Sequence, residues 1–160
     1  MFIYNSPIGS LAIEMLDGKI IRIELVNHEK GHCLANGTTD ETVCIERWLD
    51  SYFQGKQPNP NDLPIMLNGT PFQNYIWSVL LKIPYGEAFT YGQIAKTAAK
   101  HFGKEKISAQ AVGQAISRNP ILIVIPCHRV IGSNKKLTGF SAGTDVKRWL
   151  LDHEGIQYIT

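Results

Sequence analysis

The residues of this chain that are best suited to chemistry are three consecutive ones, Cys127, His128 and Arg129. A cysteine is a strong nucleophile only as its thiolate, and the neighbouring imidazole or guanidinium could help to form it. Adjacent side chains in extended chain point to opposite sides, so a water or a tight turn must join sulfur and imidazole. The imidazole in turn needs a carboxylate to fix its tautomer, and Glu154 is the candidate. The same pattern is typical of a buried structural cysteine beside a surface histidine.

The elements around this cysteine must hold it in place. The apolar run Ile121–Ile125 predicts a strand that is buried on both faces and ends at Pro126, which cannot donate to a ladder. Residues 132–143 are rich in glycine and polar side chains and predict a mobile loop beside the thiol. Thr144 is expected to cap a last helix over residues 145–153.

Residues 1–64 predict a small α+β domain in which nothing indicates catalysis. Its strands are expected at residues 2–4, 11–16 and 19–25, with a tight hairpin at Asp17-Gly18. A helix is expected over residues 42–53, with Val43, Trp48, Leu49, Tyr52 and Phe53 on its apolar side. Residues 54–64 contain three prolines and no periodicity, which indicates a linker.

Residues 65–160 predict a second, helical domain. Capping-box spacing at Thr70 and at Thr90 starts two helices. Ser108 starts another, over residues 109–117, whose side chains are mostly small. Two short helices across a turn favour helix-turn-helix geometry, although plain helix packing gives the same pattern.

The charge of the 160-residue chain is unevenly distributed. Residues 1–69 hold five basic and nine acidic side chains, a net −4, and residues 70–160 hold eleven and five, a net +6. The second half could therefore meet a polyanion such as nucleic acid, or simply have an ordinary solvated surface. Neither a membrane-length apolar run nor a signal region is present, so we expect a soluble, cytoplasmic protein.

The three cysteines, Cys33, Cys44 and Cys127, are an odd number, which favours free thiols over a disulfide framework. His28 and His32 lie near the first two, but the spacing matches no standard zinc finger. We expect surface histidines and structural cysteines there, and neither a metal nor a cofactor.

Four segments between Gly69 and Glu154 resemble the O6-alkylguanine-DNA alkyltransferases, or methylated-DNA–protein-cysteine methyltransferases. They are GTPFQNYIWSVLLKIPYGEAFTYGQIA, AVGQAISRNP, IVIPCHRVIG and LTGFSAGTDVKRWLLDHE. PCHRV with an upstream NP and a downstream LTGF is a highly specific combination. The resemblance implies an α/β (α+β) fold, in which a small strand-rich ribonuclease-H-like domain precedes a winged helix-turn-helix-like DNA-binding and active-site domain. The implied partner is double-stranded DNA containing O6-alkylguanine, and a monomer is expected.

The resemblance also implies roles for individual residues. Cys127 would accept the alkyl group, His128 would take its proton through a water, and Glu154 would orient His128. Tyr91 would help to rotate the nucleotide out of the helix and would protonate the departing guanine. DNA binding and base flipping would involve Thr90, Tyr91, Ala109, Gln110, Ala111, Gly113 and Arg118. The alkylguanine pocket would be formed by Ile116, Asn119, Val130, Phe140 and Ser141.

Two positions depart from the family pattern. Gln110 stands where many members have an arginine that replaces the extruded base, so one positive charge is missing. Phe140 stands where tyrosine is often found. Attraction to phosphate must then come from other basic residues, such as Lys104, Lys106, Arg118 or Arg129, although we expect a structural role for Arg129.

Attack on a saturated alkyl carbon would leave a thioether, which water cannot cleave, so each molecule should act once. Three other functions remain open at the level of sequence: a damage-binding module that flips the base without repair, a cysteine hydrolase that turns over, and a transcription activator triggered by self-methylation. The retained Cys127 argues against the first of these, and no additional cysteine-rich sensor domain supports the last.

Overall fold

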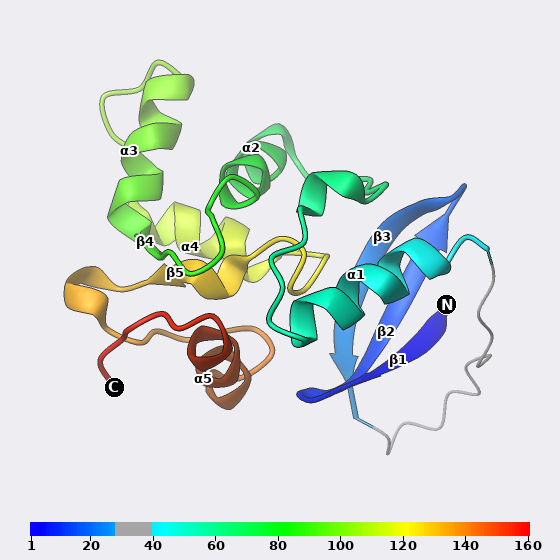
Figure 1. Cartoon of the computed structure of the whole chain (residues 1–160). Coiled ribbons are helices and arrows are strands. Elements are labelled where there is room, and N and C mark those ends of the chain that lie inside the picture. The colour runs from blue at the N-terminus through cyan, green and yellow to red at the C-terminus, as the bar shows by residue number, and fades with distance from the viewer. Residues whose placement is uncertain (28–39) are drawn as a thin grey trace. The chain divides into compact units, whose positions relative to one another are not determined.

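The chain forms two compact units, seen in a computed structural model that describes residues 1–27 and 40–160. One unit comprises Met1–Leu67 and Pro120–Leu122, and the other comprises Asn68–Asn119 and Ile123–Thr160. Strands prevail in the first unit and helices in the second (Figure 1), which confirms the expected mixed α/β class. The domain boundary expected after residue 64 stays a prediction.

The first unit is built on an antiparallel sheet of three strands. They are β1 (Phe2–Ser6), β2 (Gly9–Leu16) and β3 (Lys19–Val26), in that order across the sheet. Asp17 and Gly18 have φ values of 50° and 73°, the left-handed conformation that a two-residue hairpin turn requires. The predicted hairpin is therefore confirmed.

The helix α1 (Val43–Phe53) completes the first unit and buries one side made of Ile45, Trp48, Leu49 and Tyr52. Val43 and Phe53, which were expected on that side, are only half-buried. A short 3₁₀ turn, Pro60–Asp62, follows within the expected linker.

Three helices, α2 (Pro71–Leu80), α3 (Tyr91–His101) and α4 (Ala109–Ser117), lie together in the second unit (Figure 1). The capping boxes expected at Thr70 and Thr90 are both present. Trp77 Nε1 of α2 donates to the Ala115 carbonyl of α4 at 2.9 Å, which ties these two helices together.

The strand predicted over Ile121–Ile125 is wrong, although every residue of this run is buried. In the described chain its ladder contact is one isolated parallel bridge between Ile121 and Ile23. Ile123 has a φ of 71°, which is rare for a β-branched residue and turns the backbone away from an extended path. The apolar pattern predicted the burial of these residues correctly, but they are buried in a turn and not in a strand.

The last helix, α5 (Thr144–His153), begins differently from the prediction. Gly143, with a φ of 99°, holds the N-cap position, and its carbonyl accepts from Lys147 N at 3.2 Å. Thr144 is already inside the helix and makes no capping hydrogen bond, so the predicted cap at Thr144 is wrong.

Two short parallel strands, β4 (Phe89–Thr90) and β5 (Val130–Ile131), adjoin site residues along the chain: β4 comes directly before Tyr91, and β5 comes directly after Arg129. β5 follows a 3₁₀ turn at Cys127–Arg129, and a second 3₁₀ turn at Ser133–Lys135 lies in the loop before α5. No helix within residues 1–27 and 40–160 has the length and apolar character needed to cross a membrane.

Candidate active site

A tight turn, rather than the end of a strand, presents the thiol of Cys127. Pro126, with φ −81° and ψ 63°, makes an inverse γ-turn in which Cys127 N donates to the Ile125 carbonyl at 2.8 Å. Arg129 N then donates to the Pro126 carbonyl at 3.0 Å and closes the 3₁₀ turn. Two successive turns therefore fix the Cys127 backbone on both sides.

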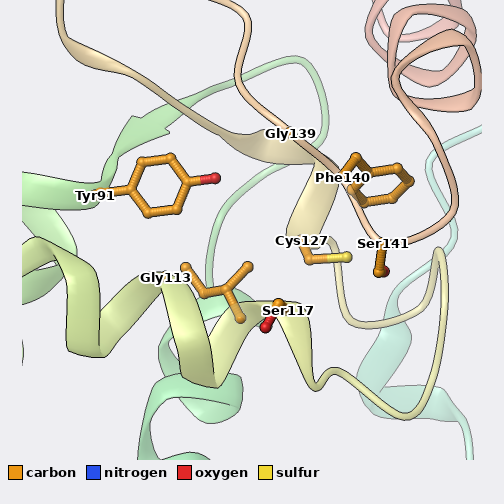
Figure 2. Close-up of a pocket in the computed structure, with 8 residues that line it drawn as sticks. Tyr91, Gly113, Ser117, Cys127, Gly139, Phe140 and Ser141 are labelled. Atoms are coloured by element: carbon orange, nitrogen blue, oxygen red, sulfur yellow. The ribbon is translucent and has the colours of Figure 1, made fainter.

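The sulfur lies in the wall of a cavity of about 270 Å³ (Figure 2). The cavity is lined by Tyr91, Gly113, Ile116, Ser117, Cys127, Gly139, Phe140 and Ser141. In Figure 2 the Tyr91 ring faces the cavity from the side opposite Phe140, with its hydroxyl directed inward. A small planar group that entered here would meet the thiol and a phenolic hydroxyl together.

Asn119, two residues beyond the end of α4, holds both the turn and the thiol. Its Nδ2 donates to the Ile125 carbonyl at 2.8 Å and to Cys127 Sγ at 3.0 Å. Because a hydrogen-bond donor favours the charged form of its acceptor, this contact makes the thiolate easier to form.

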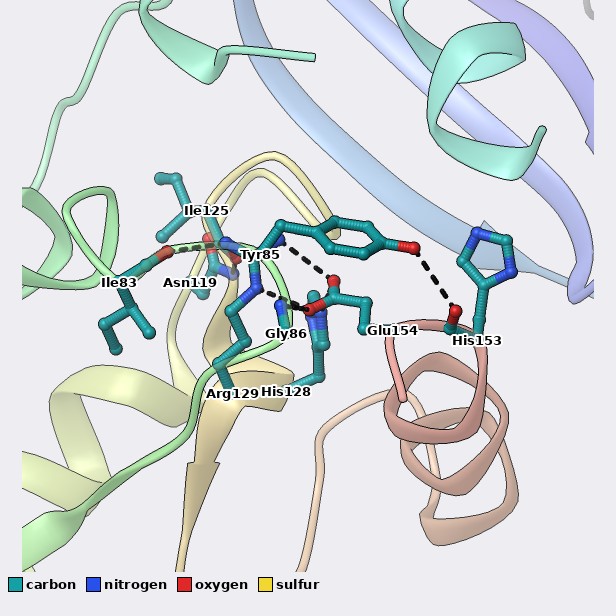
Figure 3. Close-up of polar contacts among 9 residues, drawn as sticks. All are labelled: Ile83, Tyr85, Gly86, Asn119, Ile125, His128, Arg129, His153 and Glu154. Carbon is teal, nitrogen blue, oxygen red and sulfur yellow. Dashed lines mark hydrogen bonds and ion pairs between the residues drawn. The ribbon is translucent and has the colours of Figure 1, made fainter. Parts of the chain in front are cut away.

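Behind the thiol lies a buried network that centres on the Glu154 carboxylate (Figure 3). Glu154 Oε1 accepts from His128 Nε2 at 2.7 Å and from Arg129 Nη2 at 3.0 Å. Its Oε2 accepts from Arg129 Nε at 2.8 Å and from the Gly86 backbone N at 3.3 Å. Arg129 also donates through Nη1 to the Ile83 carbonyl at 2.6 Å, so its guanidinium serves this network.

The network determines which nitrogen of His128 can act as a base. Hydrogen bonds from His128 and Arg129 hold the pKa of Glu154 well below its usual range against the opposing effect of burial, so it is an ionised carboxylate. A carboxylate only accepts, which places the imidazole proton on Nε2 and a lone pair on Nδ1. Burial lowers the pKa of His128, so the ring is neutral at rest. Among the described residues Nδ1 has no hydrogen-bond partner, which leaves it free to take a proton.

The thiol itself is protonated in the resting protein. Cys127 is 2% exposed, and burial raises its pKa to about 11, even though the hydrogen bond from Asn119 and the positive charge of Lys147 lower it. With both the Cys127 thiol and the His128 imidazole neutral, the resting site contains no thiolate. A thiolate must therefore be generated when a reaction partner is in place.

Lys147 is a site residue that the sequence analysis missed. Its side chain is completely buried, and Nζ donates to the Val130 carbonyl at 2.6 Å and to Thr138 Oγ1 at 3.1 Å. Burial lowers its pKa to about 8, while the nearby Cys127 raises it. The sequence could have revealed this residue by its position in α5, where Lys147 lies on the same buried side of the helix as Leu150 and Leu151.

The structure brings together most, but not all, of the expected pocket residues. Ile116, Phe140 and Ser141 line the cavity as expected, with Tyr91 and Gly113 from the expected DNA-binding set. Val130 is buried and does not line the cavity, and Asn119 contacts the sulfur without lining the cavity.

Other expected DNA-binding residues lie outside the cavity. Ala109, Gln110 and Arg118 are exposed, while Thr90 and Ala111 are half-buried. Ser117 and Gly139 line the cavity but were not expected there. Ser117 directly follows Ile116, and Gly139 directly precedes Phe140. Their position next to these expected pocket residues was the feature of the sequence that could have predicted them.

The described residues contain no cluster of His, Cys, Asp and Glu that could hold a metal ion. Of the alternative zinc set, His28, His32 and Cys33 lie outside the described residues, and Cys44 is exposed.

The chain is similar to known proteins over most of its length. The family profile described as "6-O-methylguanine DNA methyltransferase, DNA binding domain" matches residues 71–156. A protein of Methanosarcina acetivorans named "Methylated-DNA--protein-cysteine methyltransferase" is 42% identical over 159 residues and covers 96% of both chains. One of the same name from Haemophilus influenzae is 37% identical, covering 98% of this chain and 86% of its own.

A solved structure described as Mycobacterium tuberculosis OGT in complex with DNA has a TM-score of 0.79 to this chain. Its sequence is 35% identical, and the match covers 95% of this chain and 90% of that one. The similarity therefore extends over both units, well beyond the site.

The raised pKa of Cys127 predicts a distinctive reactivity with iodoacetamide. Because only the thiolate reacts, the alkylation rate of Cys127 should rise roughly tenfold per pH unit from pH 7 to about pH 10, whereas an ordinary thiol levels off above about pH 8.5. Peptide mapping by mass spectrometry would measure the rate, with the urea-unfolded chain as the control. A plateau near pH 8.5 in the folded protein would contradict the raised pKa.

Glu154→Gln should destabilise the protein, because it leaves Arg129 buried without its opposite charge. We expect a loss of roughly 3–5 kcal/mol in the free energy of unfolding at pH 7, measured by urea denaturation. The exposed Glu105→Gln should change it by less than about 0.5 kcal/mol. Since the pKa of Glu154 is lowered on folding, its contribution is complete above about pH 4.5 and is lost as the pH falls further. The variant should lack that part of the acid dependence, and equal losses in both variants would refute the role of the network.

Proposed function

The chain belongs to the family of methylated-DNA–protein-cysteine methyltransferases, and on this premise we propose that it repairs O6-alkylguanine in DNA by taking the alkyl group onto Cys127. One observation carries the assignment of the acceptor. The Cys127 sulfur lies in a cavity wall and is held by Asn119, and the next residue, His128, has an Nδ1 with no hydrogen-bond partner among the described residues.

The proposed transfer consists of one substitution and two proton transfers, after which His128 and Tyr91 return to their resting forms by exchange with solvent. His128 Nδ1 takes the thiol proton, through a water as in the family, and Glu154 stabilises the resulting imidazolium. The thiolate sulfur attacks the alkyl carbon, an S–C bond forms, and the C–O bond breaks with its electron pair going to the guanine. Tyr91 gives its phenolic proton to the departing purine and is later reprotonated from solvent, as the imidazolium loses its proton there. The thioether that remains has no group that water can displace, so one molecule repairs one base.

DNA binding is proposed for the side of the second unit that carries α4. Gln110, at its start, is exposed. Gly113 faces Tyr91, since a Cβ added there would lie 3.7 Å from the tyrosine Cε1. We propose that this small-faced helix enters the minor groove and that the alkylated base rotates out into the cavity, at a cost of a few kcal/mol for unstacking. A monomer in the cytoplasm, with direct access to DNA, completes the proposal.

The transfer can be tested by mixing the protein with a duplex that contains one O6-methylguanine. Intact-protein mass spectrometry and peptide mapping should find one added methyl group on Cys127, plain guanine in the DNA, and no second turnover. Cys127→Ser should abolish transfer and still bind DNA, while Cys44→Ser should react as the wild type does. Binding without any gain in mass would favour a damage-binding module, and repeated turnover would favour a hydrolase.

Gln110→Arg should strengthen DNA binding if residue 110 faces the duplex. One additional phosphate contact would steepen the dependence of log K on log salt by about 0.9. Fluorescence anisotropy from low to moderate salt would measure the slope. Gln157→Arg, which adds the same charge at an exposed position outside α4, is the matched control. Equal slopes for the two variants would show that residue 110 does not contact the backbone.

A further inference from the structure

Thr138 lies in the loop between β5 and α5, and its hydroxyl joins two groups of the active site. Thr138 Oγ1 is 3.1 Å from Tyr91 Oη and 3.1 Å from Lys147 Nζ. Thr138 belongs to no set of residues assigned above to the reaction or to DNA. Its position between a buried cation and the proton donor suggests a role for it.

The chemistry of the three groups fixes one of these hydrogen bonds and favours one direction for the other. A lysine ammonium has three donors and no acceptor, so Lys147 must donate to Thr138. The Thr138 hydrogen then needs another acceptor, and within the described residues the acceptor in reach is Tyr91 Oη. With Thr138 as the donor in this pair, Tyr91 accepts, and its own hydrogen remains available to the cavity, into which the hydroxyl points (Figure 2).

Packing holds the threonine in the orientation that this chain of donors requires. A Cβ added at Gly132 would lie 3.0 Å from Thr138 Cγ2 and 3.1 Å from the Lys136 carbonyl. The methyl group of Thr138 thus packs against the bare backbone of Gly132, which turns the hydroxyl toward Tyr91.

Lys147 is held just as firmly. Its Nζ donates to the Val130 carbonyl at 2.6 Å and lies 5.9 Å from the centre of the Phe140 ring. With its pKa lowered only to about 8, this lysine is mainly cationic at neutral pH.

We propose that Thr138 is a positioning residue that orients and polarises Tyr91 as the proton donor to the departing guanine, with Lys147 as the charge behind it. The inference rests on the proposed alkyl transfer. As Tyr91 gives its proton to the purine, negative charge develops on Oη, and the hydrogen bond from Thr138 stabilises that charge. The thiol proton goes to His128 as before, so the balance of the reaction is unchanged.

The test compares two methyl donors with different leaving groups. O6-methylguanine in DNA needs a proton on its leaving group, whereas methyl iodide releases iodide without one. Thr138→Val should slow transfer from O6-methylguanine at saturating protein by roughly ten- to a hundredfold, a part of the usual contribution of general acid catalysis. Methylation of Cys127 by methyl iodide should change by less than about twofold. Thr138→Ser, which keeps the hydroxyl, should restore transfer.

A double-mutant cycle with Tyr91→Phe separates this role from simple support of the fold. Once the phenol is absent, adding Thr138→Val should slow transfer no further. The proposal is wrong if the valine variant slows both methyl donors equally, or if its effect persists in full beside Tyr91→Phe. A wild-type protein that reacts with methyl iodide but not with O6-methylguanine would instead overturn the proposed function itself.

Discussion

The arrangement of the active site depends on one buried carboxylate. A single ionised Glu154 without partners would be strongly unfavourable in this interior, so it must be neutralised and hydrogen-bonded. Arg129 provides the charge with two hydrogen bonds, and Gly86 and His128 provide the others. These contacts tie the end of α5 to the 3₁₀ turn that carries Cys127. The same contacts select the His128 tautomer, so the stability of the fold and the proposed base function of His128 have one physical origin.

The two groups that we propose to move protons, His128 and Tyr91, belong to different elements. His128 belongs to the 3₁₀ turn, and Tyr91 opens α3. Keeping the acid and the base on separate elements lets each be tuned by its own neighbours: Glu154 holds the imidazole, while Thr138 holds the phenol. Lys147 links the two groups, because its charge acts on both the Cys127 sulfur and the Thr138 hydroxyl.

The apolar run before the thiol shows where pattern and structure separate. Periodicity and β-branching in Ile121–Ile125 indicate burial and extended backbone together, because in most proteins the two coincide. Here the run is buried, but Ile123 and Pro126 turn the chain, and the backbone groups find partners in Asn119 and within the turn. Two successive turns and the Asn119 side-chain amide therefore fix the thiol. The sequence had predicted that the end of a strand would do so.

The sequence by itself determined the features that depend on neighbours a few residues apart. The hairpin at Asp17-Gly18 and the helix starts at Thr70 and Thr90 are local hydrogen-bonding and backbone preferences, and the PCHRV segment predicts the nucleophile that we propose. Only the tertiary structure decided the partners of buried groups. Lys147 Nζ meets a carbonyl 17 positions away, and Tyr91 meets Thr138 across 47 positions. Such pairs follow from how the chain satisfies every polar group it buries, and no local pattern encodes that requirement.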